Sequence, residues 1–127
     1  MNHARFLLAA GALSGLLTVA FGAFAAHGLR HQISPDMLLV FNKGVDYQGL
    51  HALAMLVTGI MSTQHSSLAL SIAGWSFLLG ILLFSGSLYL LATSGSSWLG
   101  IITPFGGVCF IIGWLSLALA GWRHSGP

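Results

Sequence analysis

Long runs of apolar residues without a charged side chain constrain this chain more than any other feature. A helix rises about 1.5 Å per residue, so about 20 apolar residues cross a hydrocarbon core about 30 Å thick. Inside hydrocarbon every backbone N–H and C=O must be hydrogen-bonded within the protein, and a helix achieves this within one segment. The runs are continuously apolar rather than alternating, which argues against strands. The sequence predicts four membrane-spanning helices, over residues 5–26, 47–61, 68–91 and 103–122.

The composition excludes a water-soluble domain. Hydrophobic residues make up 56% of the 127 residues and charged residues only 5%, against roughly 25% charged in an ordinary soluble domain. Such high hydrophobicity also excludes a disordered chain, and a net charge of +2 is no footprint for nucleic acid. Cys109 is the only cysteine, so no disulfide forms within the chain. The charged side chains are Arg5, Arg30, Asp36, Lys43, Asp46 and Arg123.

The stretch between the first two apolar runs carries the start signals of a helix. Ser34 is a favourable N-cap, Pro35 suits the first helical position, and Asp36 favours the positive end of the helix dipole. The apolar residues that follow on one face are Met37, Leu38, Phe41 and Val45. The polar residues on the opposite side are Asn42, Lys43 and Asp46. The pattern predicts a short amphipathic helix over residues 35–46 that lies in the membrane interface.

This interfacial helix would bend near Gly44 or Gly49 into the second span. The alternative is a single long tilted helix from Asp36 to Met61. We expect the interfacial arrangement, because two ionisable groups inside hydrocarbon are energetically unfavourable. The sequence therefore predicts one all-α transmembrane domain over residues 1–127, an integral membrane four-helix bundle with an additional interfacial helix.

The first apolar run also resembles a signal peptide, with Ala23-Phe24-Ala25 as the cleavage site. Its apolar part is long for such a peptide, so we expect it to be retained as a span. Lys and Arg number two on the terminal side and two in the first loop, which leaves the orientation balanced. The basic tail with His124 favours a topology with both termini in the cytoplasm.

Small residues recur at four-residue spacing along three of the predicted spans. Such residues let helix backbones approach closely, which is how helices associate in lipid. They therefore indicate either a seam between copies in a homo-oligomer or larger complex, or internal packing of one tight bundle, and internal packing is the commoner use. The residues are Gly11, Gly15, Ser14, Thr18, Gly22, Ser76, Gly80, Gly113 and Gly121.

Polar residues near the ends of the first two spans form the first candidate site. His27 follows the first span, and Tyr47, Gln48 and His51 open the second. If the chain folds back, His27 and His51 approach at one membrane level, where they could bind a metal or haem, carry a proton, or hold a polar head group. The alternative is that both histidines bond a neighbouring backbone and fix the register of the bundle. Two imidazoles without a carboxylate or thiolate make a weak metal site, so we expect the structural role and no cofactor.

Ser85, Ser87 and Tyr89 form a second candidate patch near the end of the third span. It predicts either a polar pocket or helix packing with an interfacial aromatic anchor. The sequence contains no Walker loop, no H-E-x-x-H motif, and no Ser/His/Asp set with a credible acid. We therefore expect a protein that is not an enzyme.

Several segments resemble one known family in the same order along the chain. They are Gly22-Ala-Phe-Ala-Ala-His-Gly-Leu29, Tyr47-Gln48 with His51-Ala-Leu53, Phe84-Ser-Gly-Ser-Leu-Tyr89, Thr103-Pro-Phe-Gly-Gly107 and Gly113-Trp114. This pattern is similar to the YgdD/YwdK family of small membrane proteins, although Ala25 and Phe41 depart from it. The resemblance implies a four-helix integral membrane protein of bacterial inner membranes, and it implies no established activity.

Packing residues outnumber residues suited to catalysis, so we expect a membrane module that assembles with itself or a larger complex, or binds a lipid-like ligand. The lipid bilayer is its expected partner. A small transporter or a proton- or metal-handling protein that uses His27 and His51 is the alternative.

Overall fold

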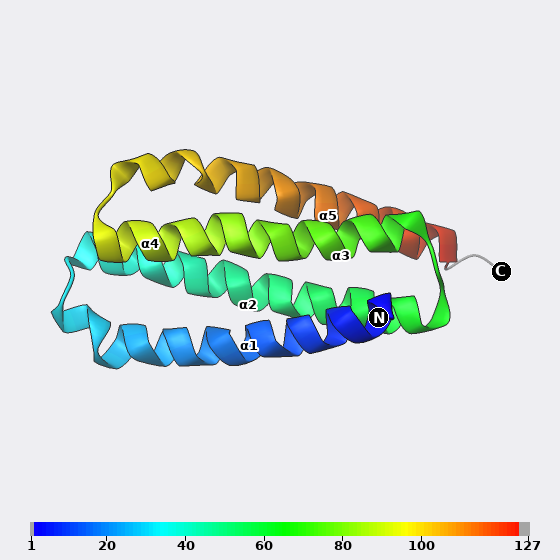
Figure 1. Ribbon diagram of the computed structural model, residues 1–127, viewed down its shortest axis with the longest axis horizontal. Coiled ribbons are helices and arrows are strands. Elements are labelled where there is room, and N and C mark those ends of the chain that lie inside the picture. The colour runs from blue at the N-terminus through cyan, green and yellow to red at the C-terminus, as the bar shows by residue number, and fades with distance from the viewer. Residues whose placement is uncertain (1, 125–127) are drawn as a thin grey trace.

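The computed structural model describes residues 2–124, and within them every long element is a helix (Figure 1). Short helical turns over Leu29–His31, Ile81–Ser85 and Ser97–Ile101 link the longer elements, and the second of these is a wide π-helical turn. It joins α3 and α4 into one continuous rod from Leu68 to Ser94. The long helices are α1 (His3–His27), α2 (Pro35–Gln64), α3 (Leu68–Gly80), α4 (Gly86–Ser94) and α5 (Thr103–His124).

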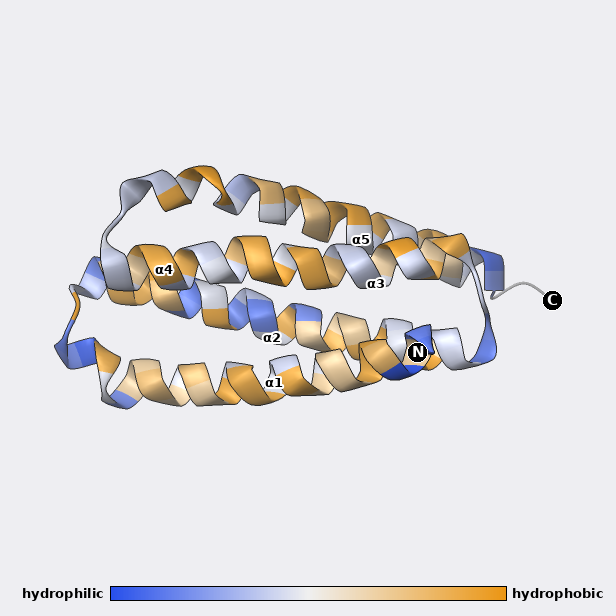
Figure 2. Cartoon of the chain, viewed as in Figure 1, coloured by the Kyte–Doolittle hydropathy of each residue, from blue (hydrophilic) through white to orange (hydrophobic). Residues whose placement is uncertain are grey.

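Three helical segments are long and apolar enough to cross a membrane, and they are His3–His31, Leu68–Ser94 and Ser97–His124. The predicted spans 5–26, 68–91 and 103–122 lie within them. The predicted span 47–61 lies in the second half of α2, whose polar side chains lower its mean hydropathy. Figure 2 shows these apolar rods, with hydrophilic residues at the two ends of the bundle and along part of α2.

The region predicted as an interfacial helix is instead the first part of α2, which runs without a break from Pro35 to Gln64. Ser34 does cap it, because its Oγ accepts a hydrogen bond from the Met37 N–H at 3.2 Å. The predicted bend is absent, since the apolar face carrying Phe41 and Val45 packs inside the bundle against Ala25 and Ala92. That packing replaces burial in the membrane surface, and the single long helix is the arrangement that forms.

Gly44 allows a close helix contact in place of a bend. A Cβ atom built on Gly44 would lie 2.8 Å from Cε1 of Tyr89 on α4. Real Cβ atoms do not come this close to a ring, so a side chain at this position would force α2 and α4 apart. The glycine therefore serves the packing of two helices.

Several of the small residues at four-residue spacing face the inside of this bundle. Added Cβ atoms would meet Leu56 of α2 from Gly11 and Phe77 of α3 from Gly113, at 3.1 and 2.6 Å. Gly80 and Phe110 make a similar contact between α3 and α5. These contacts favour internal packing for the residues concerned, whereas Gly15 lies beside open space. The core that they close contains Leu7, Ala54, Met55, Ala73, Phe77, Ile81 and Phe110.

Candidate functional site

His51 is the most buried polar ring of the bundle, with 2% of its surface exposed. The indole Nε1–H of Trp114 donates a hydrogen bond to its Nε2 at 3.0 Å. Its other nitrogen, Nδ1, lies 2.7 Å from the backbone oxygen of Tyr47. Because Nε2 accepts, Nδ1 carries the proton and donates to that oxygen. Both ring nitrogens are therefore occupied, and the imidazole is neutral.

Aromatic rings from α3 and α5 hold the His51 ring in place. It stacks on Phe110, with ring centroids 3.5 Å apart and planes 8° apart. Phe77 and Trp114 approach it at 5.7 and 5.8 Å. Phe110 and Trp114 lie one turn apart on α5, so both reach the same side of α2. Three helices meet at this histidine.

Gln48 forms a second polar junction, one turn nearer the start of α2. Its Nε2 donates to the backbone oxygen and to the Oγ of Ser14 on α1, both at 3.2 Å. Its Oε1 accepts a 2.5 Å hydrogen bond from the Tyr89 hydroxyl on α4. Gln48 thus links α1 to α4 through the buried middle of the bundle.

The two serines of the second candidate patch continue this polar layer. The Ser85 hydroxyl donates to the Gly44 backbone oxygen at 2.7 Å. Ser87 and Thr103 share a 2.6 Å hydrogen bond that ties α4 to the start of α5. Through the Tyr89–Gln48 bond the second candidate patch joins the first at Gln48, and these bonds tie neighbouring helices together.

We expect Tyr89→Phe to lower the free energy of unfolding by about 1–3 kcal/mol, because the Gln48 Oε1 is then buried without a donor. Gln48→Leu should cost a similar amount, and the double variant should cost less than the sum, since the pair is removed together. The measurement is thermal or denaturant unfolding in one detergent. Thr93→Val, at an exposed position on α4, is the control and should change little. Additive effects for the pair would contradict the bond.

His27 lies away from this network. It is exposed at the end of α1, while Ser14 of α1 contacts Gln48 of α2. The two helices run in opposite directions, so His27 is displaced roughly 20 Å along α1 from that contact, toward the connection between them. His51 is displaced the other way. The predicted meeting of His27 and His51 is therefore wrong, because it needed the start of the second span to lie beside the end of the first.

Within residues 2–124 no group of three or more His, Cys, Asp or Glu side chains is placed to hold a metal ion. The hydrogen bonds of His51 also leave it no lone pair for a ligand.

Four partners of the candidate residues were not anticipated from the sequence. Ser14 belongs to the predicted small-residue seam, and Thr103 to a segment that resembles the family. Phe110 and Trp114 lie on one face of α5 at a spacing of four residues, which is a signal that aromatic packing could have suggested. Their meeting with His51 depends on how α5 docks.

Three adjoining cavities follow the outer side of α2 and share one residue, Tyr47. The first, of about 400 Å³, includes Lys43 and Asp46. The second, of about 430 Å³, lies against α4 and includes Phe84 and Leu88. The third, of about 460 Å³, opens between α2 and α5 beside His51 and Trp114. We call these three cavities together the Tyr47 groove.

A family model described as "Protein of unknown function (DUF423)" matches residues 21–107. The UPF0382 membrane protein YwdK of Bacillus subtilis is 44% identical over 115 residues, which cover 90% of this chain and 94% of that one. A UPF0382 membrane protein of Staphylococcus aureus is 43% identical over 122 residues, covering 96% and 99%. The chain belongs to the DUF423 family.

This placement confirms the resemblance to the family that includes YwdK. A UPF0382 membrane protein of Haemophilus influenzae is also similar to this DUF423 protein, with 46% identity over 113 residues, 88% of this chain and 90% of that one. No solved structure matches. The relatives are described as membrane proteins, in agreement with the apolar helices. The matched segment contains the Gln48, Ser85 and Tyr89 network and ends before Phe110 and Trp114.

Proposed function

We propose that this protein is a non-enzymatic membrane module that binds a lipid-like amphiphile in the Tyr47 groove. One observation carries the proposal: the three cavities join a charged end at Lys43 to an aromatic end at Trp114, with Tyr47 in the wall of each. A molecule with a polar head and an apolar chain has the same order of polarity along its length.

The walls of the groove suit each part of such a molecule. Lys43 and Asp46 lie near the end of the bundle where α1 connects to α2, and both are exposed. Cationic and polar side chains at that level contact lipid head groups. Farther along, Phe84, Val108 and Ile111 line the groove with apolar surface. Ligand sites are mostly apolar with a few polar groups that fix orientation.

Tyr47 connects the two parts. Its side chain is 42% exposed, and its ring packs against Phe84 of the Leu68–Ser94 rod with centroids 4.6 Å apart. The aromatic neighbours keep this ring in one position, while its exposed part faces the groove. A preformed wall of this kind reduces the ordering cost of binding.

The alternative of a transporter or a metal-handling protein is not favoured by any contact described above. It required His27 and His51 to act at one site, and they lie at different levels. His51 has both nitrogens bonded inside the protein.

Filling the groove tests the proposal. Gly107 lines its third cavity, and an added Cβ at this position meets no atom within 4 Å. We expect Gly107→Leu to leave folding intact and to reduce co-purified lipid roughly tenfold, equivalent to about 1.4 kcal/mol of binding. The measurement is quantitative mass spectrometry of lipid extracted from protein purified in mild detergent.

Gly15→Leu is the matched control, because Gly15 also has open space beside it and lies on α1, outside the groove. It should leave the lipid content unchanged. Equal lipid loss in both variants, or wild-type protein without stoichiometric lipid, would contradict the proposed function.

We further propose that the protein lies in the cell inner membrane with both termini in the cytoplasm. The terminal end of the bundle carries Arg5, Arg123 and the basic tail with His124, which support this orientation. Alkaline phosphatase fused to the C-terminus should be inactive, and a fluorescent protein fused there should fold. The opposite pattern would reverse the topology.

A further inference from the structure

The terminal end of the bundle carries a second set of polar groups that the Tyr47 groove does not use. There the start of α1 lies near the connection from α2 to α3, to the right in Figure 1. Two cavities adjoin at this end and share Asn2. One of them is polar, and the other is largely apolar.

The polar cavity has a volume of about 390 Å³ and is lined by residues from both sides of the α2–α3 connection and from the start of α1. Two helices begin at it. The Oδ1 of Asn2 accepts from the Ala4 N–H at 2.8 Å, and the Oγ of Ser67 accepts from the Leu70 N–H at 3.1 Å. The positive ends of two helix dipoles thus face one cavity, which favours an anion.

His3 also lines the polar cavity. Its Nε2 is buried and has no hydrogen-bond partner within residues 2–124. A buried nitrogen without a partner is destabilising, and most such atoms in folded proteins are paired.

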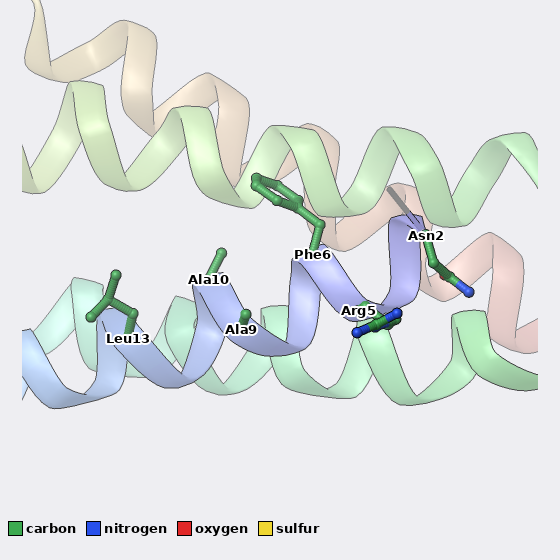
Figure 3. A pocket seen from close by; sticks show the side chains of 6 residues that line it. All are labelled: Asn2, Arg5, Phe6, Ala9, Ala10 and Leu13. Atoms are coloured by element: carbon green, nitrogen blue, oxygen red, sulfur yellow. The ribbon is translucent and has the colours of Figure 1, made fainter.

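The adjoining cavity, of about 560 Å³, continues from Asn2 along α1. Figure 3 shows Asn2 and Arg5 on the first turns of the helix, with Phe6, Ala10 and Leu13 following along it. Phe6 also stacks on Trp75 of α3, with centroids 5.2 Å apart. The cavity therefore has a cation at one end and an apolar wall along its length, which is the shape of an acyl chain leading from a charged head group.

The distribution of charge selects the sign of that head group. Arg5 and Arg123 are the charged side chains of this end, and both are cations. At the other end two cations are balanced by two acids. Cations near a membrane surface attract anionic lipids, with an affinity that adds up over the cations.

We propose that the terminal end is a specific site for an anionic phospholipid. The phosphate lies where the two cavities meet at Asn2, close to Arg5 of the adjoining cavity and to the starts of α1 and α3. One acyl chain follows α1 past Ala9 and Leu13. This site lies at the opposite end of the bundle from Lys43, so it is separate from the Tyr47 groove.

The test uses the full chain in neutral detergent micelles, with the affinities for dioleoylphosphatidylglycerol and dioleoylphosphatidylcholine measured by native mass spectrometry. We expect wild-type protein to prefer phosphatidylglycerol about tenfold, and Arg5→Gln to reduce that preference to about twofold or less. Arg30→Gln removes the same charge at the other end and should leave the preference unchanged. No preference in wild-type protein, or equal losses in the two variants, would overturn the site.

A second pair of variants tests the acyl chain. Ala9→Phe fills the apolar cavity from an exposed position and should weaken phosphatidylglycerol binding about tenfold. Ala20→Phe, exposed on α1 but outside the cavity, should not. If inorganic phosphate at millimolar concentration displaces the lipid, or if Ala9→Phe is without effect, the site binds a free anion and the lipid assignment is wrong.

The two proposals fail separately. Gly107→Leu blocks the Tyr47 groove and should leave the preference for phosphatidylglycerol intact. Loss of that preference in Gly107→Leu would place the anionic lipid in the groove and overturn the terminal site.

Discussion

Gly106→Ala is expected to destabilise the bundle by about 3 kcal/mol or more, at the upper end of the range for overpacked cores. The added Cβ would overlap the backbone nitrogen of Phe84 and lie 2.8 Å from its Cα. Phe84 belongs to the π-helical turn between α3 and α4. Backbone atoms cannot rotate away as the tip of a side chain can, so α5 must move away from the Leu68–Ser94 rod. Thermal unfolding in detergent measures the effect.

Gly107→Ala is a control from the next residue of the same helix. An added Cβ there meets nothing within 4 Å, and alanine is the better helix former by about 0.5–1 kcal/mol. We expect this variant to be slightly more stable than the wild type. Similar unfolding temperatures for Gly106→Ala and Gly107→Ala would contradict the close approach of α5 to the Leu68–Ser94 rod.

His51→Ala is expected to lower the free energy of unfolding by about 3–5 kcal/mol, the range for deleting a large buried ring. The variant removes a ring whose centroid lies 3.5 Å from that of Phe110, and it leaves the Trp114 N–H without its acceptor. In an apolar surrounding that unpaired donor adds to the loss. Leu53→Ala, on the same helix with a side chain 63% exposed, should change stability far less.

A double-variant cycle separates the His51 hydrogen bond from the His51 volume. His51→Phe keeps a flat ring against Phe110 and strands the Trp114 donor, while Trp114→Phe strands the His51 Nε2. The double variant should therefore lose less stability than the sum of the two single variants. Additivity would show that the two residues contribute independently and would contradict the bond.

His51 shows how far the sequence alone reached. The sequence left two roles open for His51, a ligand or a structural residue bonded to the backbone of a neighbouring helix. Its ring instead bonds the Tyr47 oxygen of its own helix and the Trp114 indole. The sequence could not show that Trp114 pairs with the His51 Nε2, because Trp114 is distant in sequence and the pairing depends on how α5 docks. The expected approach of His27 to His51 does not occur for the same reason, since it depends on how α2 packs beside α1. A motif near the end of one helix says little about the level at which the next helix begins.

Gln48 and Tyr89 were likewise identifiable from the sequence as polar residues, but their pairing was not. Each was identified as a candidate because polar residues in an apolar chain are few, but they were assigned to separate patches. The structure joins them by one hydrogen bond across α2 and α4. The sequence could identify the polar groups, since burial in hydrocarbon leaves each of them in need of a partner. It could not identify the pairs.

The amino-acid sequence by itself determined that this protein lies in a lipid bilayer, that it is all-helical, and approximately where the long apolar helices lie. These properties follow from hydrophobicity and length, which are local and additive along the chain. Only the tertiary structure decided that residues 35–46 continue into α2, because their apolar face finds Ala25 and Ala92 inside the bundle. It also decided which residues surround His51 and where the cavities lie. Those outcomes depend on contacts between helices distant in sequence, whose geometry is set by packing of whole surfaces.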